Sequence, residues 1–274
     1  MKDQVCIVTG STSGIGKATV FGLAGLGATV VMIARNPELG KQTKDDVVRE
    51  TGNSNIDVLI ADLASQQAIR QVADEFKSKY KTVSLLVNNA GYAGPRVLTN
   101  DGIERTFAVN HLAYFLLTNL LLDVLKGSAP ARILNVSSEA HRNVTINFDD
   151  LQMENNYSGF RAYSVSKLCN ILFTYELARR LQGSSVTANA LHPGFLSTGI
   201  FREAPSVVQF AVKIIAGSAE KGADAIIHLG TAPQLQNVSG KYFNGKKEVR
   251  SAEQTYDREA AERLWKVSEQ MTVI

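Results

Sequence analysis

The sequence has few of the residues that would indicate a secreted or metal-binding protein. Its 274 residues include only two cysteines, Cys6 and Cys169, which lie far apart in apolar runs. Small secreted domains need several paired cysteines, so we interpret both as reduced core thiols of a cytoplasmic protein. The four histidines, at positions 111, 141, 192 and 228, show no metal-ligand spacing. The sequence therefore predicts no metal site.

Long apolar stretches and an excess of one charge are also absent. The longest apolar run, 112–122, is interrupted by Thr118 and Asn119 and is too short to cross a bilayer. Residues 1–3 lead directly into a short apolar run, so we expect neither a signal region nor a membrane span. The formal net charge is +3, with basic residues spread along the chain, which argues against a nucleic-acid partner.

Short apolar runs alternate with longer amphipathic stretches. The first run, 5–9, is continuous rather than alternating, as expected of a strand that is covered on both faces. Further runs that predict strands are 28–34, 56–61, 83–87, 132–136, 186–191 and 241–243. Stretches that predict helices are 39–50, 65–79, 101–126, 163–181 and 220–229. This alternation predicts one α/β domain spanning 1–274, a Rossmann-type doubly wound parallel sheet of about seven strands.

A glycine-rich turn separates the first strand from the following helical stretch. Such a turn directs backbone N–H groups and a helix N-terminus at a phosphate, and glycine permits the close approach of the backbone. The sequence therefore predicts a dinucleotide-binding turn made of Gly10, Ser11, Thr12, Ser13, Gly14, Ile15 and Gly16.

The end of the second strand indicates which dinucleotide binds. An acidic residue there would hold the ribose hydroxyl of NAD, whereas an arginine accommodates the 2′-phosphate of NADP. The strand ends at Arg35-Asn36 without an acid, and Lys17 follows the glycine turn. We expect NADP(H) rather than NAD(H), with Arg35 and Asn36 at the cofactor. The alternative, that these cations are solvated surface charges, stays open.

Tyr163 and Lys167 are four residues apart at the start of an apolar helical run. They share one helix face. A phenol titrates near ~10 in water, and a neighbouring ammonium lowers that pKa. The pair therefore predicts a tyrosine that transfers protons near neutral pH. Such a pair alone is equally typical of a solvated helix face, but polar residues at the predicted strand ends, where ligands of such sheets bind, support the functional interpretation.

Five motifs, in this order along the chain, resemble those of the short-chain dehydrogenase/reductase family over about residues 3–270. They are Thr9–Gly16, Asn88-Asn89-Ala90-Gly91, Ser138, Tyr163-x3-Lys167 and Pro193-Gly194. The segments 135–141, 146–151, 175–181 and 264–269 are similar to its retinol-dehydrogenase-like branch. Members of that branch often carry an N-terminal membrane anchor, which we do not expect here.

The resemblance implies a role for each matching residue. Tyr163 would be the catalytic acid/base, and Lys167 would lower its pKa and hold the nicotinamide ribose. Ser138 would bond the substrate oxygen, and Asn110 would hold a proton-relay water, or only bond nearby backbone. Further cofactor contacts implied by the family are Asp62, Leu63, Asn89, Ala90, Gly91, Pro193, Gly194 and Thr198.

The apolar segment 195–217 follows the Pro-Gly turn and includes Phe195 and Phe201. We interpret it as a lid over an apolar pocket that Tyr92, Tyr157 and Phe160 also line, although a packing helix is the alternative. The expected activity is hydride transfer between NADP(H) and a small lipophilic alcohol, aldehyde or ketone. A catalytically silent NADP(H)-sensing or scaffolding protein is the rival hypothesis. Family members often form homodimers or homotetramers through the Tyr-Lys helix, but the sequence does not separate its outer face from its core face.

Overall fold

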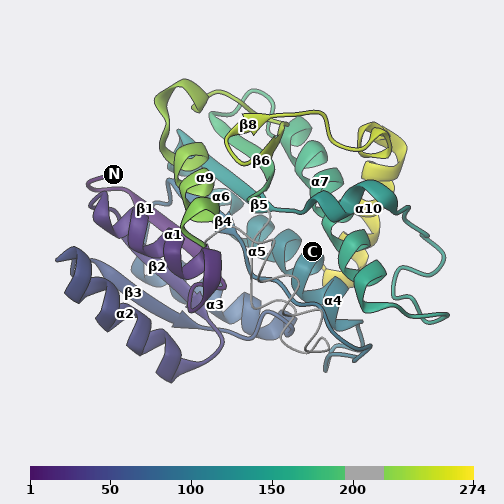
Figure 1. Ribbon diagram of the computed structural model, residues 1–274, viewed down its shortest axis with the longest axis horizontal. Coiled ribbons are helices and arrows are strands. Elements are labelled where there is room, and N and C mark those ends of the chain that lie inside the picture. Colours follow the sequence, from purple (N-terminus) through teal and green to yellow (C-terminus); the bar gives the residue numbers. More distant parts are fainter. Residues whose placement is uncertain (195–218) are drawn as a thin grey trace.

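The computed structural model of the chain describes residues 1–194 and 219–274. Eight strands form one sheet in the order β3-β2-β1-β4-β5-β6-β7-β8 (Figure 1). Neighbouring strands from β3 to β7 are parallel, and β8 runs antiparallel to β7. The strands are β1 (Val5–Thr9), β2 (Thr29–Ala34), β3 (Ile56–Ile60), β4 (Leu85–Asn88), β5 (Ala131–Val136), β6 (Val186–His192), β7 (Tyr242–Asn244) and β8 (Lys247–Glu248).

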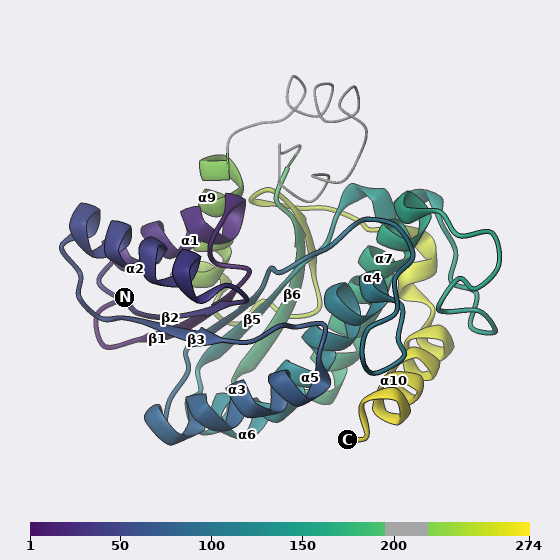
Figure 2. The same cartoon turned by 90° about the horizontal axis from the view of Figure 1, so that it is seen from below.

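Helices cover both faces of this sheet (Figure 2). One face packs against α1 (Gly14–Gly25), α2 (Pro37–Thr51) and α9 (Ala219–Thr231). The other packs against α3 (Gln66–Lys79), α5 (Ala113–Leu120) and α7 (Gly159–Arg180). The remaining helical segments are α4 (Arg105–Phe107), the π-helix η1 (Ala108–Leu112), α6 (Leu122–Gly127), η2 (Glu139–Asn143), η4 (Pro233–Leu235), η5 (Glu253–Tyr256) and α10 (Arg258–Thr272).

The continuous apolar strands follow from this two-sided cover. In β1, Cys6 and Val8 lie in the core beneath α1 and α9, whereas Ile7 lies in the core beneath α5 and α7. All three side chains are fully buried. Because successive side chains of a strand point to opposite faces, a strand covered on both sides needs apolar residues at every position.

The strand order determines at which edge of the sheet a ligand is expected to bind. The chain builds β1, β2 and β3 toward one edge and then returns to β4, which pairs with the other side of β1. Connections therefore leave β1 and β4 in opposite directions, and a crevice opens between them beyond their carboxyl ends. Gly10 follows β1 and Asn89 follows β4, so the predicted cofactor residues lie at that crevice.

The structure corrects two predicted elements. The sheet has an eighth strand, because Gly245, at a φ of 59°, turns the chain back after β7. The predicted helix 101–126 begins only at Arg105 and contains a π-helical turn. Gly102, at a φ of 72°, closes a turn with Thr99 that prevents an earlier start. The amphipathic pattern did not reveal either feature, since both depend on local backbone conformation.

The C-terminal helix α10 covers the outer side of α7. Every residue of α7 from 162 to 177 is buried. Trp265 of α10 packs edge-on against Phe115 of α5 with ring centroids 4.9 Å apart. It also lies 5.8 Å from the Phe173 ring and 4.1 Å from the Arg180 guanidinium carbon. The helix that carries Tyr163 and Lys167 is therefore part of the core of this chain.

None of the helices in the described part of the chain is both long and apolar enough to cross a membrane. Trp265 is 5% exposed and is a core residue of this chain.

Replacing Trp265 by alanine removes a ring that α5, α7 and Arg180 enclose. We expect a loss of about 3–5 kcal/mol in the free energy of unfolding, as for large aromatic-to-alanine changes in cores. Urea denaturation followed by circular dichroism measures it. The matched control is Lys266→Ala on the exposed side of the same helix, which should change stability by less than about 0.5 kcal/mol. Equal effects of the two changes would contradict the packing described for α10.

Candidate active site

The end of β5 is joined to α7 by three successive contacts. Lys167 Nζ donates to the carbonyl oxygen of Val136 at 2.9 Å, and the Ser137 hydroxyl donates to the Lys167 carbonyl at 2.7 Å. The Ser138 hydroxyl bonds the Tyr163 phenol. The structure therefore brings Ser138, Tyr163 and Lys167 together, beside the crevice where the sequence placed them.

Lys167 is an ammonium group with almost no access to solvent. It is 1% exposed, and its Nζ lies 5.6 Å from the ring centroids of both Tyr114 and Tyr163. Burial disfavours the charged form and lowers the pKa of Lys167 to about 7. One carbonyl and two aromatic faces are its neighbours, and no carboxylate is among the causes of the shift. Burial therefore weakens the charged form of this lysine relative to a solvent-exposed one.

The Tyr163 phenol titrates in the direction opposite to our expectation. Burial raises the pKa of Tyr163 above its usual value, and the hydrogen bond from Ser138 offsets only part of that. The sequence analysis assigned Lys167 a full positive charge that would lower this pKa, but the burial that both groups share weakens the ammonium as well. In the chain by itself, the phenol of Tyr163 is protonated and is placed to donate its proton.

Asn110 lies in the π-helical turn η1 and is fully buried. Its amide donates to the Tyr92 carbonyl and to the Ser166 hydroxyl, both at 2.9 Å, and its Oδ1 accepts from the Tyr92 N–H at 2.7 Å. Both amide protons are thus bonded within the chain, as expected if Asn110 only bonds nearby groups. The side chain ties the segment after β4 to α7, and a relay water has no amide proton of Asn110 available.

The glycine turn packs against the segment that follows β4. Thr9 Oγ1 accepts from the N–H groups of Asn89 and Ala90 at 2.8 and 3.0 Å, and Asn89 Nδ2 donates to the Thr9 carbonyl at 2.9 Å. A Cβ on Gly16 would lie 2.1 Å from the Gly10 carbonyl oxygen. Gly10 itself has a φ of 65°. Two of the predicted glycines are therefore required by the close packing of this turn.

The N-terminus of α1 suits the phosphates of a dinucleotide. Its N-cap, Ser13, makes no side-chain cap, and its first turn carries no acidic residue. The first N–H groups of a helix lack partners within the helix, and they attract anions. Gly14 has a φ of 52°, and a Cβ there would meet no atom within 4 Å, so this side of the turn is open. The residues present fit the cofactor that the sequence implies.

The residues predicted to select NADP(H) differ in the partners that they have within the chain. Arg35 is exposed after β2, and no ion pair involves it among the described residues. Lys17 instead pairs with Asp46 at 3.0 Å, so it is not a free cation at the cofactor. Asn36 caps α2 by accepting from the Leu39 N–H.

The other predicted cofactor residues lie along the same edge of the sheet. The Ser11 hydroxyl donates to the Ile33 carbonyl, which ties the glycine turn to β2. Asp62 follows β3, where its Oδ1 accepts from the Ala64 N–H, and Leu63 beside it is buried. Pro193 and Gly194 follow β6.

Part of the predicted substrate site lies outside the described residues. This applies to Phe195, Thr198, Phe201 and the proposed lid at 195–217. Of the flanking aromatics, Tyr157 donates to Gly94 and Glu104 at 3.1 Å, and Phe160 is 64% exposed. Among described residues, no group of three or more His, Cys, Asp or Glu side chains is placed to hold a metal ion.

His141 lies close to Ser138, although the sequence offered no reason to assign it a role. His141 is fully buried, and its Nδ1 lies 2.6 Å from the Ser138 carbonyl oxygen. Its position three residues after the serine was visible in the sequence, but nothing in the spacing showed that η2 would turn the ring back.

Comparisons with known proteins agree with this geometry. A family model described as short chain dehydrogenase matches residues 4–208. The chain is 42% identical over 272 residues to retinol dehydrogenase 13 of Homo sapiens, an alignment that covers 96% of this chain and 82% of that protein. It is 40% identical over 281 residues to polyprenol dehydrogenase of Homo sapiens, with 98% and 85% covered.

Solved structures share the fold. A crystal structure of an uncharacterized protein from Mycobacterium Paratuberculosis has a TM-score of 0.80 at 32% identity and covers 99% of this chain and 94% of its own. The RhlG/NADP active-site complex of Pseudomonas aeruginosa has a TM-score of 0.73 at 24% identity, with 89% and 95% covered. With the glycine turn, the serine, the tyrosine and the lysine on one edge of the sheet, the chain belongs to the short-chain dehydrogenase/reductase family, in its retinol-dehydrogenase-like branch.

Proposed function

We propose that the chain is an NADP(H)-dependent oxidoreductase that interconverts a lipophilic alcohol with its aldehyde or ketone. The observation that carries this proposal is the contact of Ser138 with Tyr163, one helical turn from the buried Lys167. A sensing or scaffolding protein would gain nothing from a buried lysine beside a buried phenol, because burial removes the hydration of both groups.

When bound at the glycine turn, a nicotinamide cofactor would provide the hydride chemistry at the carbonyl carbon, and the residues of the chain would orient it and handle the proton. In the reducing direction, the Ser138 hydroxyl bonds the substrate oxygen and Tyr163 donates its proton as negative charge develops there. The raised pKa of Tyr163 keeps that proton in place until the oxygen becomes basic. Lys167 lies one helical turn from Tyr163, and burial lowers its pKa, so it gives up a proton more readily than an exposed lysine.

The finer parts of the proposal have separate support. Preference for NADP(H) is supported by the exposed Arg35 after β2, where no acidic residue is present to accept from a ribose hydroxyl. A lipophilic substrate is supported by relatives named for retinol and polyprenol, both long apolar alcohols. The apolar sequence at 195–217 agrees with such a substrate.

Replacing Tyr163 by phenylalanine removes the proton donor and keeps the ring. We expect kcat/KM to fall at least ~100-fold, the range of general acid–base contributions, with the Kd of NADPH within about threefold of wild type. Turnover is followed with retinal and straight-chain aldehydes, and the alcohol product is quantified by chromatography. The control is Tyr175→Phe, which removes a hydroxyl from the same helix. A wild-type chain that binds NADPH and reduces none of these carbonyls would favour the silent protein instead.

Replacing Arg35 by aspartate exchanges the expected partner of a 2′-phosphate for an acceptor that suits a ribose hydroxyl. We expect the KM for NADPH to rise at least ~10-fold, about 1.4 kcal/mol, while the KM for NADH stays level or falls. Lys17→Gln is the matched control, because Lys17 already pairs with Asp46 and should affect NADPH less. A parallel loss for both cofactors would remove Arg35 from the selection of NADP(H).

The lowered pKa of Lys167 also predicts how the free energy of unfolding depends on pH. The pKa of Lys167 is about 7 in the folded chain and 10.5 in the unfolded chain, so the unfolded chain binds the extra proton between these values. The unfolding free energy contributed by this group therefore rises with pH across that window. Without cofactor, Lys167→Met should be more stable than wild type by a few kcal/mol near pH ~6, and this gain should shrink toward pH ~10. Urea titrations at both pH values measure the gain, and Lys266→Met is the exposed control. A gain that does not change with pH contradicts the assigned charge state.

A further inference from the structure

The carbonyl group of Ser138 extends beyond the sheet. The ladder between β5 and β6 ends with the Ser137 N–H, which donates to the Leu191 carbonyl at 2.7 Å. Ser138 has extended backbone angles and caps η2, since its hydroxyl accepts from the Ala140 N–H at 3.2 Å. Its position relative to Tyr163 is therefore set by contacts other than strand pairing.

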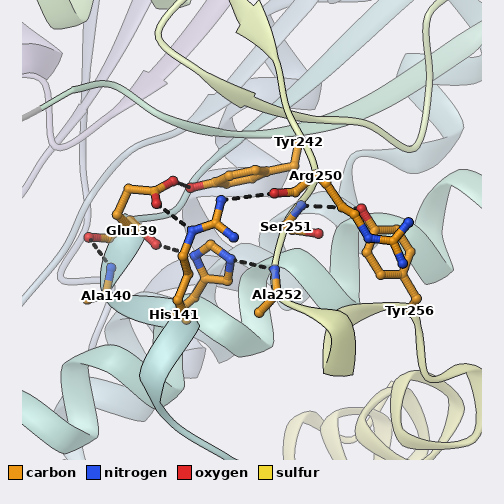
Figure 3. Close-up of polar contacts among 10 residues, drawn as sticks. Glu139, Ala140, His141, Tyr242, Arg250, Ser251, Ala252 and Tyr256 are labelled. Atoms are coloured by element: carbon orange, nitrogen blue, oxygen red, sulfur yellow. Dashed lines mark hydrogen bonds and ion pairs between the residues drawn. The ribbon is translucent and has the colours of Figure 1, made fainter.

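One of these contacts is the imidazole ring of His141. Its Nδ1 is 2.6 Å from the Ser138 carbonyl oxygen, and its Nε2 is 3.1 Å from the Ala252 backbone nitrogen (Figure 3). A backbone N–H only donates, so Nε2 must be the acceptor and Nδ1 must carry the proton. The ring is thus neutral and in one tautomer. Burial also lowers the pKa of His141, which keeps the second proton off the ring.

The neighbours of His141 hold η2 against the chain that follows β7. The Tyr242 hydroxyl donates to Glu139 at 2.8 Å, and the Tyr242 ring lies edge-on to the imidazole at 5.0 Å (Figure 3). Arg142 bonds Glu139 at 2.5 Å and donates to the Arg250 carbonyl at 2.9 Å. Segment 250–256 and the turn after Ser138 are therefore one polar assembly, although about a hundred residues separate them in sequence.

We propose that His141 is a positioning residue, which fixes the carbonyl group of Ser138 through its Nδ1–H and is itself fixed by the Ala252 N–H at Nε2. This assignment rests on the proposed hydride-transfer function. The ring does not touch the substrate oxygen; it sets the distance at which the Ser138 hydroxyl meets Tyr163 and that oxygen. Small misplacements of reacting groups lower turnover by as much as ~100-fold. Loss of a contact in this assembly should therefore lower kcat more than it weakens binding.

Two substitutions separate the two bonds of the ring. His141→Asn places an amide near the position of Nδ1 and keeps the bond to the Ser138 carbonyl. His141→Gln places an amide near Nε2, so it keeps the bond from Ala252 and loses the one to Ser138. We expect kcat of the glutamine variant to fall ~10- to 100-fold and that of the asparagine variant to stay within about threefold of wild type.

The readouts distinguish positioning from a loss of stability. KM for the aldehyde, the Kd of NADPH and the Tm of His141→Gln should each stay close to those of His141→Asn. Tyr175→Phe is the matched control for a loosened segment 250–256, because it removes the 2.8 Å bond to Ser251 and leaves the His141 ring in place, so its kcat should fall less than that of His141→Gln. A glutamine variant with wild-type kcat, or a kcat loss equal to that of Tyr175→Phe, overturns the proposal.

A second measurement does not depend on activity. The chain has four histidines, so the His141 resonances are assigned in a ¹⁵N spectrum by their loss in His141→Gln. We expect the Nδ1–H tautomer at neutral pH, and amide resonances of Ser138 and Ala140 that move in the glutamine variant but not in the asparagine variant. An Nε2–H tautomer, or amides that move equally in both variants, contradicts the proposal. If wild type transfers no hydride, the function fails and this spectrum still decides the role of His141.

Discussion

The bond from Lys167 Nζ to the Val136 carbonyl oxygen is the constraint on which the site depends. A lysine that is 1% exposed loses nearly all of its hydration, and burial lowers its pKa to about 7. Hydrophobic replacement of such a group is often stabilising, so a fold selected only for stability has little reason to keep it. The bond fixes α7 against the end of β5, and the contact between Tyr163 and Ser138 depends on that alignment.

The topology of the sheet makes this alignment useful. β1 and β4 are neighbours, and the crevice beyond their carboxyl ends is lined by the glycine turn and Asn89. β5 is next to β4, so Ser138 lies one strand away from the cofactor crevice. A parallel sheet delivers all of these strand ends to one edge, and the buried helix α7 brings the phenol to the same edge. The position of the site thus follows from the strand order, and few residues have a role in the site alone.

The sequence predicted the parts of the site that have local signals. The strand 5–9, the glycine turn and the Tyr163-x3-Lys167 pair were all recognisable because each is a short pattern with its own geometry. The upward shift of the Tyr163 pKa in the chain by itself could not be predicted, because burial is a property of the assembled core and no four-residue spacing reports it. Lys17 was assigned to the cofactor for the same reason, since its pairing with Asp46 crosses 29 residues.

Different hydrogen bonds fix the two sides of the crevice. On the side of the glycine turn, the Thr9 hydroxyl accepts from the Asn89 N–H, and the Asn89 side-chain amide donates to the Thr9 carbonyl. On the substrate side, the Ser138 carbonyl is met by a side chain that is in turn held by Ala252. Both sides therefore depend on side chains, Thr9 and Asn89 on one and His141 on the other, and these come from different segments. Substitutions in segment 250–256 should therefore act on Ser138 and leave the contacts of the glycine turn unchanged.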